Sequence, residues 1–166
     1  MATANYSGVP RARQAMAHAI LHRMRALGLD VGQKTIGVAV SDETGLIATP
    51  LRTLGRQSVA RDAAALVSLA QELGAGTVVV GLPLDLDGQV GLAARRALAL
   101  REPLERAGLS VETWDERFST VAAERALLEA DLSRRRRKEL VDKVAAAVIL
   151  QGWLDARRAE RPREEP

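Results

Sequence analysis

Short apolar runs alternate with turn residues in the first folded part of the chain. This pattern predicts three strands, over residues 27–31, 35–40 and 46–54, with a tight turn at 32–34 between the first two. Because connections this short join antiparallel neighbours, we expect the three strands to form a meander. Pro50 has no backbone N–H to donate to a sheet, so the third strand is expected at an edge.

After residue 58, the apolar positions no longer alternate as in a strand but recur every three to four residues, as in a helix. Gly74 ends this first helical pattern, and a continuously apolar run then predicts a buried strand. Pro103 should kink or divide the helix that follows. The elements expected after the meander are a helix at 59–73, a strand at 77–80, a helix at 93–108, a strand at 110–114, a helix from Ser119 or Thr120 to about 130, and a helix at about 137–158.

The order of these elements, β-β-β-α-β-α-β-α-α, predicts an α/β domain. Two right-handed crossovers add parallel strands to the antiparallel meander. The expected fold is therefore a mixed five-stranded sheet, with three antiparallel strands followed by two parallel strands and with helices on both faces. We expect this domain to span residues 25–158 and to be followed by a charged tail at 159–166.

Residues 1–24 differ from the domain in composition, because they hold three arginines and no acidic residue. The strand pattern begins directly after Met24, so we expect 1–24 to be a poorly ordered extension and Met24 to be a candidate natural start. The rest of the chain holds 21 basic and 21 acidic residues. The net charge of the domain therefore gives no argument for nucleic acid, and only local clusters could.

Composition excludes several kinds of catalytic site. A chain of 166 residues fits one domain, and it contains no cysteine and only two histidines, His18 and His22. Disulfides, thiolate catalysis and zinc–thiolate sites are excluded, and a Ser–His–Asp site cannot be built after residue 24. No apolar run reaches the roughly 18–20 residues of a membrane span, so we expect no membrane association. Because the chain has no cysteine, we expect it to work in the reducing cytoplasm. An enzyme of this composition would use carboxylates, hydroxyls, lysine, arginine or a metal.

Two acidic residues stand where the pattern is otherwise apolar. Asp30 lies at the end of the first predicted strand, where it could be a metal ligand or a turn-forming residue before Gly32. Asp142 shares a helix face with apolar and small residues, and it could be a ligand or the ion-pair partner of Lys138 one turn earlier.

A third acidic position follows the last predicted strand. Asp115, Glu116 and Arg117 lie at its carboxyl end, where ligands gather in open parallel sheets, although they could instead form a salt-bridged helix entry. Carboxylates from two strand ends and one helix can converge on Mg²⁺ or Mn²⁺. Two such ions about 4 Å apart would support phosphodiester hydrolysis without histidine or cysteine.

The chain resembles the YqgF/RuvX family of RNase H-like proteins, described as Holliday junction resolvases and as pre-16S rRNA processing nucleases. The resemblance covers about residues 25–153 and implies an RNase H-like fold and a metal-dependent nuclease. It rests on four blocks in order, LGLDVGQKTIGVAVSD (27–42), TVVVGLPLDLDG (77–88), DERFST (115–120) and VDKVAAAVIL (141–150).

Carried over residue by residue, the resemblance implies that Asp30, Glu116 and Asp142 are the metal-binding catalytic acids. Related resolvases carry the second acid at the end of the fourth strand, where this chain has Gly81. We therefore assign the second position to Glu116, with Asp115 as its rival. Asp85, in the loop after Gly81, is a weaker candidate.

Several basic residues near these acids are candidates for contacts with phosphate. Lys34 and Arg117 each lie beside a proposed ligand. A run of five further basic residues could be a solvated loop or could bind a nucleic-acid backbone. Its members are Arg134, Arg135, Arg136, Arg137 and Lys138.

The expected partner is structured RNA or branched DNA, and the sequence does not choose between them. Symmetric cleavage of a junction would need two active sites and hence a homodimer. A non-catalytic ribosome-assembly factor of the same fold is one alternative. Another is an ATP-binding protein of the actin, Hsp70 or sugar-kinase type, which the length disfavours because those proteins need two such lobes.

Overall fold

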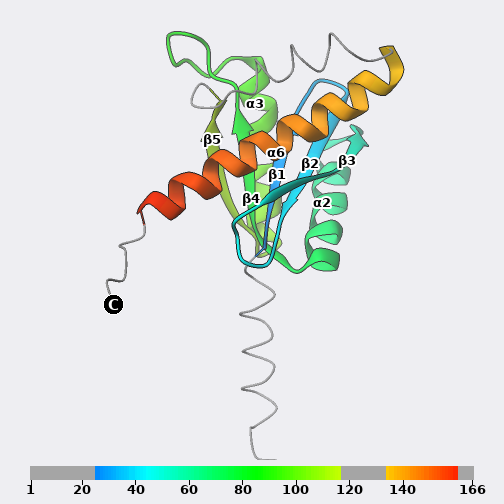
Figure 1. The fold of residues 1–166 in the computed structure, drawn as a ribbon. Helices are drawn as coiled ribbons and strands as arrows, with labels where there is room; N and C mark the ends of the chain where they lie inside the picture. The colour runs from blue at the N-terminus through cyan, green and yellow to red at the C-terminus, as the bar shows by residue number, and fades with distance from the viewer. Residues whose placement is uncertain (1–24, 117–133, 161–166) are drawn as a thin grey trace, which may run out of the picture.

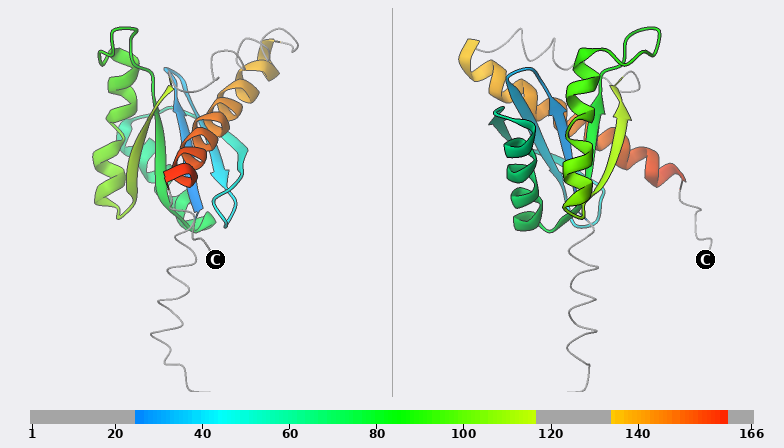
Figure 2. Two further views of the ribbon diagram at one scale, coloured as in Figure 1. Left: turned by 60° about the vertical axis from the view of Figure 1, so that its left-hand side comes forward. Right: turned by 180° about the vertical axis from the view of Figure 1, so that it is seen from behind.

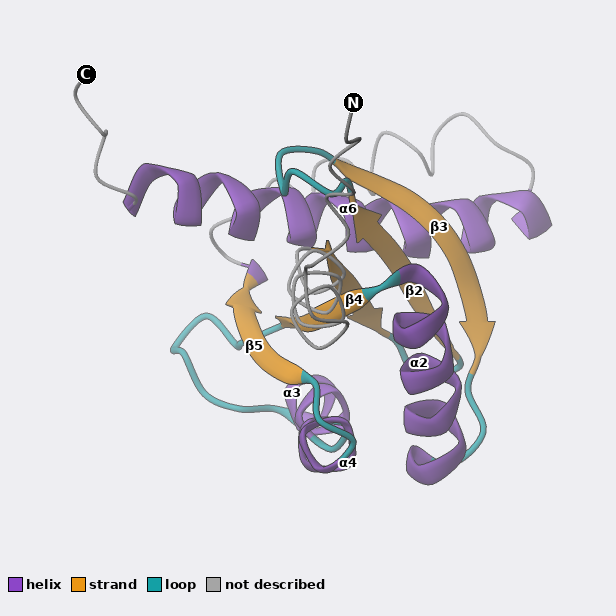
Figure 3. Ribbon diagram, turned by 90° about the horizontal axis from the view of Figure 1, so that it is seen from below, coloured by secondary structure: helices purple, strands orange, loops and turns teal. Residues whose placement is uncertain are grey.

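The computed structural model describes residues 25–116 and 134–160 as a layered α/β domain. Within these residues, five strands form one sheet in the order β3-β2-β1-β4-β5. Helix α6 (Arg134–Glu160) crosses one face of the sheet, and α2, α3 and α4 lie on the opposite face (Figures 1 and 3). Seen from behind, α2, α3 and α4 lie in front of the sheet and α6 lies beyond it (Figure 2, right).

The sheet has the predicted pattern of three antiparallel strands followed by two parallel strands. β1 pairs antiparallel with β2 and parallel with β4, while β3 and β5 form the two edges. The register between β2 and β3 shifts next to Pro50, which lies on an edge strand as expected. The strands span Arg25–Val31 (β1), Thr35–Ser41 (β2), Ala48–Gly55 (β3), Ala75–Leu82 (β4) and Ser110–Asp115 (β5).

The helices on the far face begin and end at sequence signals. α2 (Val59–Leu73) starts after Ser58, whose side chain accepts a hydrogen bond from the Arg61 N–H, and ends at Gly74 in the left-handed conformation. The next predicted helix is divided into α3 (Leu92–Leu98) and α4 (Arg101–Arg106). Pro103 falls in the first turn of α4, where its missing N–H leaves no helical bond unmade.

Helix α6 begins earlier than the sequence pattern indicates. The pattern predicts a basic stretch followed by a helix from about residue 137, but the backbone is helical from Arg134. Arginine is a good helix former, so the apolar period alone underestimates the helix. No described helix is long and apolar enough to cross a membrane. The helix predicted from Ser119 or Thr120 lies outside the described residues, as do the extension 1–24 and residues 161–166 of the tail.

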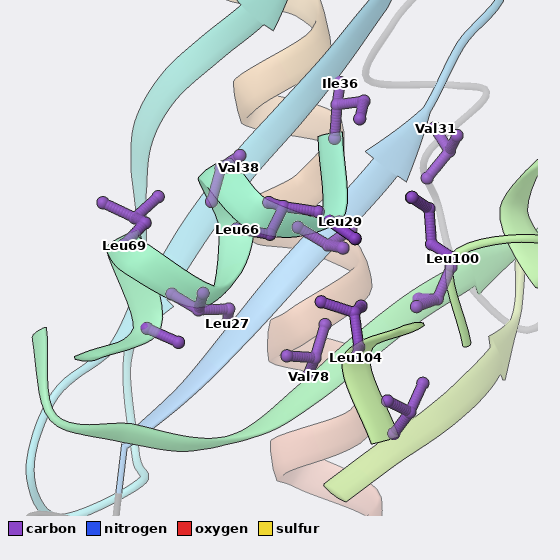
Figure 4. Close-up of a cluster of buried hydrophobic side chains, with 14 of the residues drawn as sticks. Leu27, Leu29, Val31, Ile36, Val38, Leu66, Leu69, Val78, Leu100 and Leu104 are labelled. Carbon is purple, nitrogen blue, oxygen red and sulfur yellow. The ribbon is translucent and has the colours of Figure 1, made fainter. Parts of the chain in front are cut away.

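The core between the sheet and α2, α3 and α4 is built from large aliphatic side chains. Leu27 and Leu29 of β1 pack with side chains of β2, β4 and α2 and with Leu100 and Leu104, all of them buried (Figure 4). Each large aliphatic side chain buried here contributes on the order of 1.5–3 kcal/mol to folding. This core fixes the positions of the strands that carry the candidate site.

The layer between the sheet and α6, on the opposite face, is thin, because glycines in the strands let the backbone of α6 approach closely. A Cβ at Gly28 would lie 2.6 Å from the Ala146 carbonyl oxygen, and one at Gly37 would overlap the Asp142 carbonyl. The core on this side is accordingly rich in alanine and includes Ala145 and Ala146. The small residues of helix and sheet together set the height of α6 above the strands.

Asp42 organises the turn between β2 and β3. Its carboxylate accepts hydrogen bonds from the N–H groups of Leu46 and Ile47, at 2.8 and 2.9 Å, and from the Thr44 hydroxyl. The N–H of Ile47 and the hydroxyl of Thr44 lower the pKa of Asp42 to about 2. The ionised carboxylate is therefore the form that holds the turn.

We expect Gly37→Ala to destabilise the fold by about 1–3 kcal/mol or more, because the new methyl group meets backbone atoms that cannot turn aside. Gly55→Ala is the matched control, since a Cβ there has no neighbour within 4 Å. Urea unfolding of both variants measures the difference. Equal midpoints would show that α6 does not rest on Gly37 as described.

We expect the free energy of unfolding to decrease as the pH is lowered from about 4 to about 2. Part of this decrease comes from Asp42, whose pKa is lowered to about 2 in the folded chain. The contribution is complete above the unfolded pKa and is lost as the folded carboxylate takes up a proton. Asp42→Asn removes it, so the difference in stability between wild type and variant should shrink as the pH falls through this window. Thermal melts from pH 5 to pH 2 test this, and parallel curves would contradict it.

Candidate active site

Asp30 is a buried carboxylate on the face of β1 that α6 covers. The residue is 7% exposed, and it pairs across the antiparallel ladder with Gly37 of β2. Alternation along the strand places it on the same face as Gly28, against which α6 packs. Asp30 thus lies near the carboxyl end of β1, under the helix.

Asp142 lies over β2, two turns into α6. Its backbone carbonyl rests on Gly37, the cross-strand neighbour of Asp30, so helix and sheet set the two acids at neighbouring positions on one face. The Thr35 hydroxyl donates a hydrogen bond of 2.5 Å to Oδ2 of Asp142. The predicted alternative of an ion pair with Lys138 falls on a side chain that is not described.

Glu116 follows β5 and turns back over β4. Its Oε1 lies 2.7 Å from the position that a Cβ at Gly81 would take. Continued by one residue beyond the pair Leu29–Val80, the parallel register sets Asp30 beside Gly81. The carboxylate of Glu116 therefore occupies the space next to Asp30 that a side chain at position 81 would fill.

The rival acids lie elsewhere. Asp115 pairs with Leu82, one register position on from the pair Gly81–Trp114, so alternation places it on the face away from α6. Asp85 lies in the loop after β4, where its carboxylate is 3.1 Å from a Cβ position at Gly91, and where its carbonyl accepts the Gly88 N–H. The geometry brings Glu116, and neither rival, to the face shared with Asp30 and Asp142.

The three acids come from three different elements and lie on or over neighbouring strands of the sheet. The strands beneath them are neighbours in the order β2-β1-β4, and adjacent strands are about 4.8 Å apart. Among the described residues, no group of three acidic or histidine side chains is already close enough to hold a metal ion. The oxygen donors suit a hard divalent cation, and binding one would require the side chains to turn toward each other.

The turn between β1 and β2 is braced by residues that the sequence analysis did not single out. The Arg56 guanidinium donates to the Gly32 carbonyl at 3.2 Å and pairs with the buried Asp62 at 3.2 Å. The Arg56 N–H also donates to the Lys34 carbonyl. In the sequence, this ion pair could have been anticipated from an arginine and an aspartate that flank the helix cap Ser58.

The basic candidates differ in how far the structure places them. Lys34 is exposed in the turn at the carboxyl end of β1. The run 134–138 forms the first turns of α6, and its last residue lies about 6 Å along the helix axis from Asp142. The side chains of this run and the whole of Arg117 lie outside the described residues.

Comparison with known proteins identifies the family of the chain. The family model described as "RuvX: Holliday junction resolvase" matches residues 24–156. A protein of Symbiobacterium thermophilum named "Putative pre-16S rRNA nuclease" is 54% identical over 84% of this chain and 97% of its own length. A Myxococcus xanthus protein of the same name is also 54% identical, over 81% of this chain and 90% of its own length.

Among solved structures, the RuvC of Thermus thermophilus in complex with a Holliday junction substrate has a similar fold. The TM-score is 0.54 at 18% sequence identity, and the match covers 82% of this chain and 97% of that one. This likeness supports the predicted RNase H-like arrangement of the strands. The match of the family model and the identity to the two relatives show that the chain belongs to the RuvX family and is a nuclease.

Proposed function

We propose that the protein is a divalent-metal-dependent nuclease that hydrolyses phosphodiester bonds of structured RNA at the end of pre-16S rRNA. The observation that carries the proposal is the placement of three acids on one face of the sheet, near the carboxyl end of β1. They come from segments far apart in the chain: Asp30, Glu116 and Asp142. Three carboxylates close together do not stabilise an apolar fold, but they can bind a divalent cation.

In this proposal Asp30, Glu116 and Asp142 hold Mg²⁺ or Mn²⁺, in one or two ions. A bound divalent cation supplies activation of water and stabilisation of charge on the phosphate. Asp30 is the central ligand, because it lies between Gly37, which underlies Asp142, and Gly81, which underlies Glu116. Burial under α6 restricts the access of bulk water to Asp30 and strengthens its interaction with a cation.

Basic residues near this end of β1 would hold the substrate by its phosphates. Lys34 is exposed at the end of β1, and the run from Arg134 to Lys138 leads along α6 toward Asp142. We assign Arg117 to the same role from its place next to Glu116 in the sequence. Since the domain has few aromatic side chains for base stacking, recognition should depend on the backbone and shape of the nucleic acid.

Branched DNA is the second candidate substrate, because the matching family model is described as a Holliday junction resolvase. The names of the relatives that are 54% identical favour the rRNA precursor. Cleavage of matched precursor-rRNA and junction substrates separates the two. Symmetric cutting of a junction would also require a homodimer, whereas trimming of RNA would not. Either substrate places the work of the protein in the cytoplasm.

We expect Asp30→Asn, Glu116→Gln and Asp142→Asn each to reduce cleavage about 10²-fold or more, the scale of losing one preorganised charged group from a site. Wild-type activity should require Mg²⁺ or Mn²⁺ and disappear in EDTA. Asp115→Asn is the control, because alternation places that carboxylate on the other face of the sheet. Circular dichroism of each variant verifies folding.

Three outcomes would contradict this proposal or its assignments. Full activity of extensively chelated wild-type protein would exclude the metal-dependent mechanism. An inactive Asp115→Asn beside an active Glu116→Gln would move the second ligand to Asp115. Binding of precursor rRNA without cleavage under any metal condition would favour the non-catalytic assembly factor.

Replacing Arg134, Arg135 and Arg136 with alanine should weaken binding across nucleic-acid sequences and flatten its salt dependence, by about 0.7–0.9 in log–log slope per lost phosphate contact. Alanine maintains the helix, so the fold should persist. The control removes three exposed arginines from the helices on the far face, Arg61, Arg101 and Arg106. Fluorescence anisotropy at several salt concentrations measures both. Equal slopes for the two triple variants would assign the run to a solvated helix end.

A further inference from the structure

A hydrogen bond joins the beginning of β2 to the carboxylate of Asp142. The hydroxyl of Thr35 donates to Oδ2 of Asp142 at 2.5 Å, across 107 residues of sequence, in a partly buried environment. Of the side chains that the structure describes, Thr35 is the one recorded donor to this carboxylate. Its partner is one of the three acids that the proposed function assigns to the metal.

Thr35 is held firmly from its own side of the contact. Its carbonyl accepts the Gly32 N–H at 2.8 Å, and it pairs with Gly55 across the ladder between β2 and β3. The same turn is tied to the buried Asp62 through Arg56, whose side chain is 14% exposed while that of Asp62 is 3% exposed. The hydroxyl therefore projects from a backbone that has little freedom to shift.

Asp142 is restrained from the other side. Its backbone carbonyl lies against Gly37, so the main chain of α6 cannot turn at this point. The freedom left to the carboxylate is rotation of its own side chain, and one strong hydrogen bond is enough to select an orientation. A neutral hydroxyl selects it without cancelling the negative charge, as a lysine or arginine partner would.

We propose that Thr35 is a positioning residue, which orients the carboxylate of Asp142 so that Oδ2 is held by the hydroxyl and Oδ1 is presented to the cation. The proposal rests on the proposed function, because it concerns the same metal-binding acids. A hydroxyl that holds a ligating carboxylate acts as outer-shell support for the metal site. Thr35 touches neither substrate nor reacting atoms in this role.

The test compares Thr35→Val, which removes the hydroxyl at nearly constant shape, with Thr35→Ser, which retains it. Thr49→Val makes the same chemical change at an exposed position of β3 and is the matched control. Calorimetric titration with Mn²⁺ gives the affinity of each protein without any nucleic acid. Thermal melts in EDTA report separately on the metal-free fold.

We expect Thr35→Val to weaken Mn²⁺ binding about 10- to 100-fold, the usual scale for loss of an outer-shell partner. Thr35→Ser should restore most of the affinity, and Thr49→Val should bind as wild type does. In an Asp142→Asn background, adding Thr35→Val should lower the affinity no further. A lower melting temperature of Thr35→Val with unchanged Mn²⁺ affinity would overturn the proposal, because the hydroxyl would then only fasten α6 to the sheet.

Failure of this inference and failure of the proposed function give different results. If wild-type protein neither binds Mn²⁺ nor cleaves with it, the metal-dependent function fails. If wild type binds and cleaves while Thr35→Val does both equally well, the function stands and the positioning role of Thr35 fails.

Discussion

Direct contact between the backbone of α6 and the glycines of the sheet determines where the candidate site can form. Gly28 and Gly37 each lie so close to α6 that a methyl group would meet backbone atoms, at Ala146 and Asp142 respectively. The carbonyl of Asp142 is thereby seated on the cross-strand neighbour of Asp30. A helix packed on ordinary side chains would stand farther off, and its carboxylate would lie beyond reach of the strand ends.

The fold brings the three acids to one face of the sheet, near the carboxyl end of β1. Each is fixed by a different element, and the strands beneath them are about 4.8 Å apart, so three negative charges are held near one another without being forced into contact. Mutual repulsion would disperse such a group if it stood on a mobile loop. Here the large core on the other face of the sheet stabilises the fold enough to offset the repulsion between the carboxylates.

Much of this arrangement could be predicted from the sequence, because its signals are local. Periodicity and turn residues predict the strands, and Pro50 predicts the edge. The apolar period could not show that α6 begins at Arg134, because arginine favours a helix without contributing to that period. Nor could it show the bond from Thr35 to Asp142, which depends on the register of a helix against a strand 107 residues away. The separation of Glu116 from Asp115 needed the observed pairing of β5 with β4.

The seven residues of β1 show how the two faces of the sheet differ in role: one face builds the core and the other carries the candidate site. Leu27, Leu29 and Val31 enter the leucine-rich core on one face, and alternation turns Ala26, Gly28 and Asp30 to the face of α6. The large side chains supply most of the burial energy, so the other face can have small residues and a charge without unfolding the strand. A charge is least costly at Asp30, because it lies near the end of the strand, where a counter-ion can approach. The same alternation that builds the core therefore selects the position at which an acid can serve as a ligand.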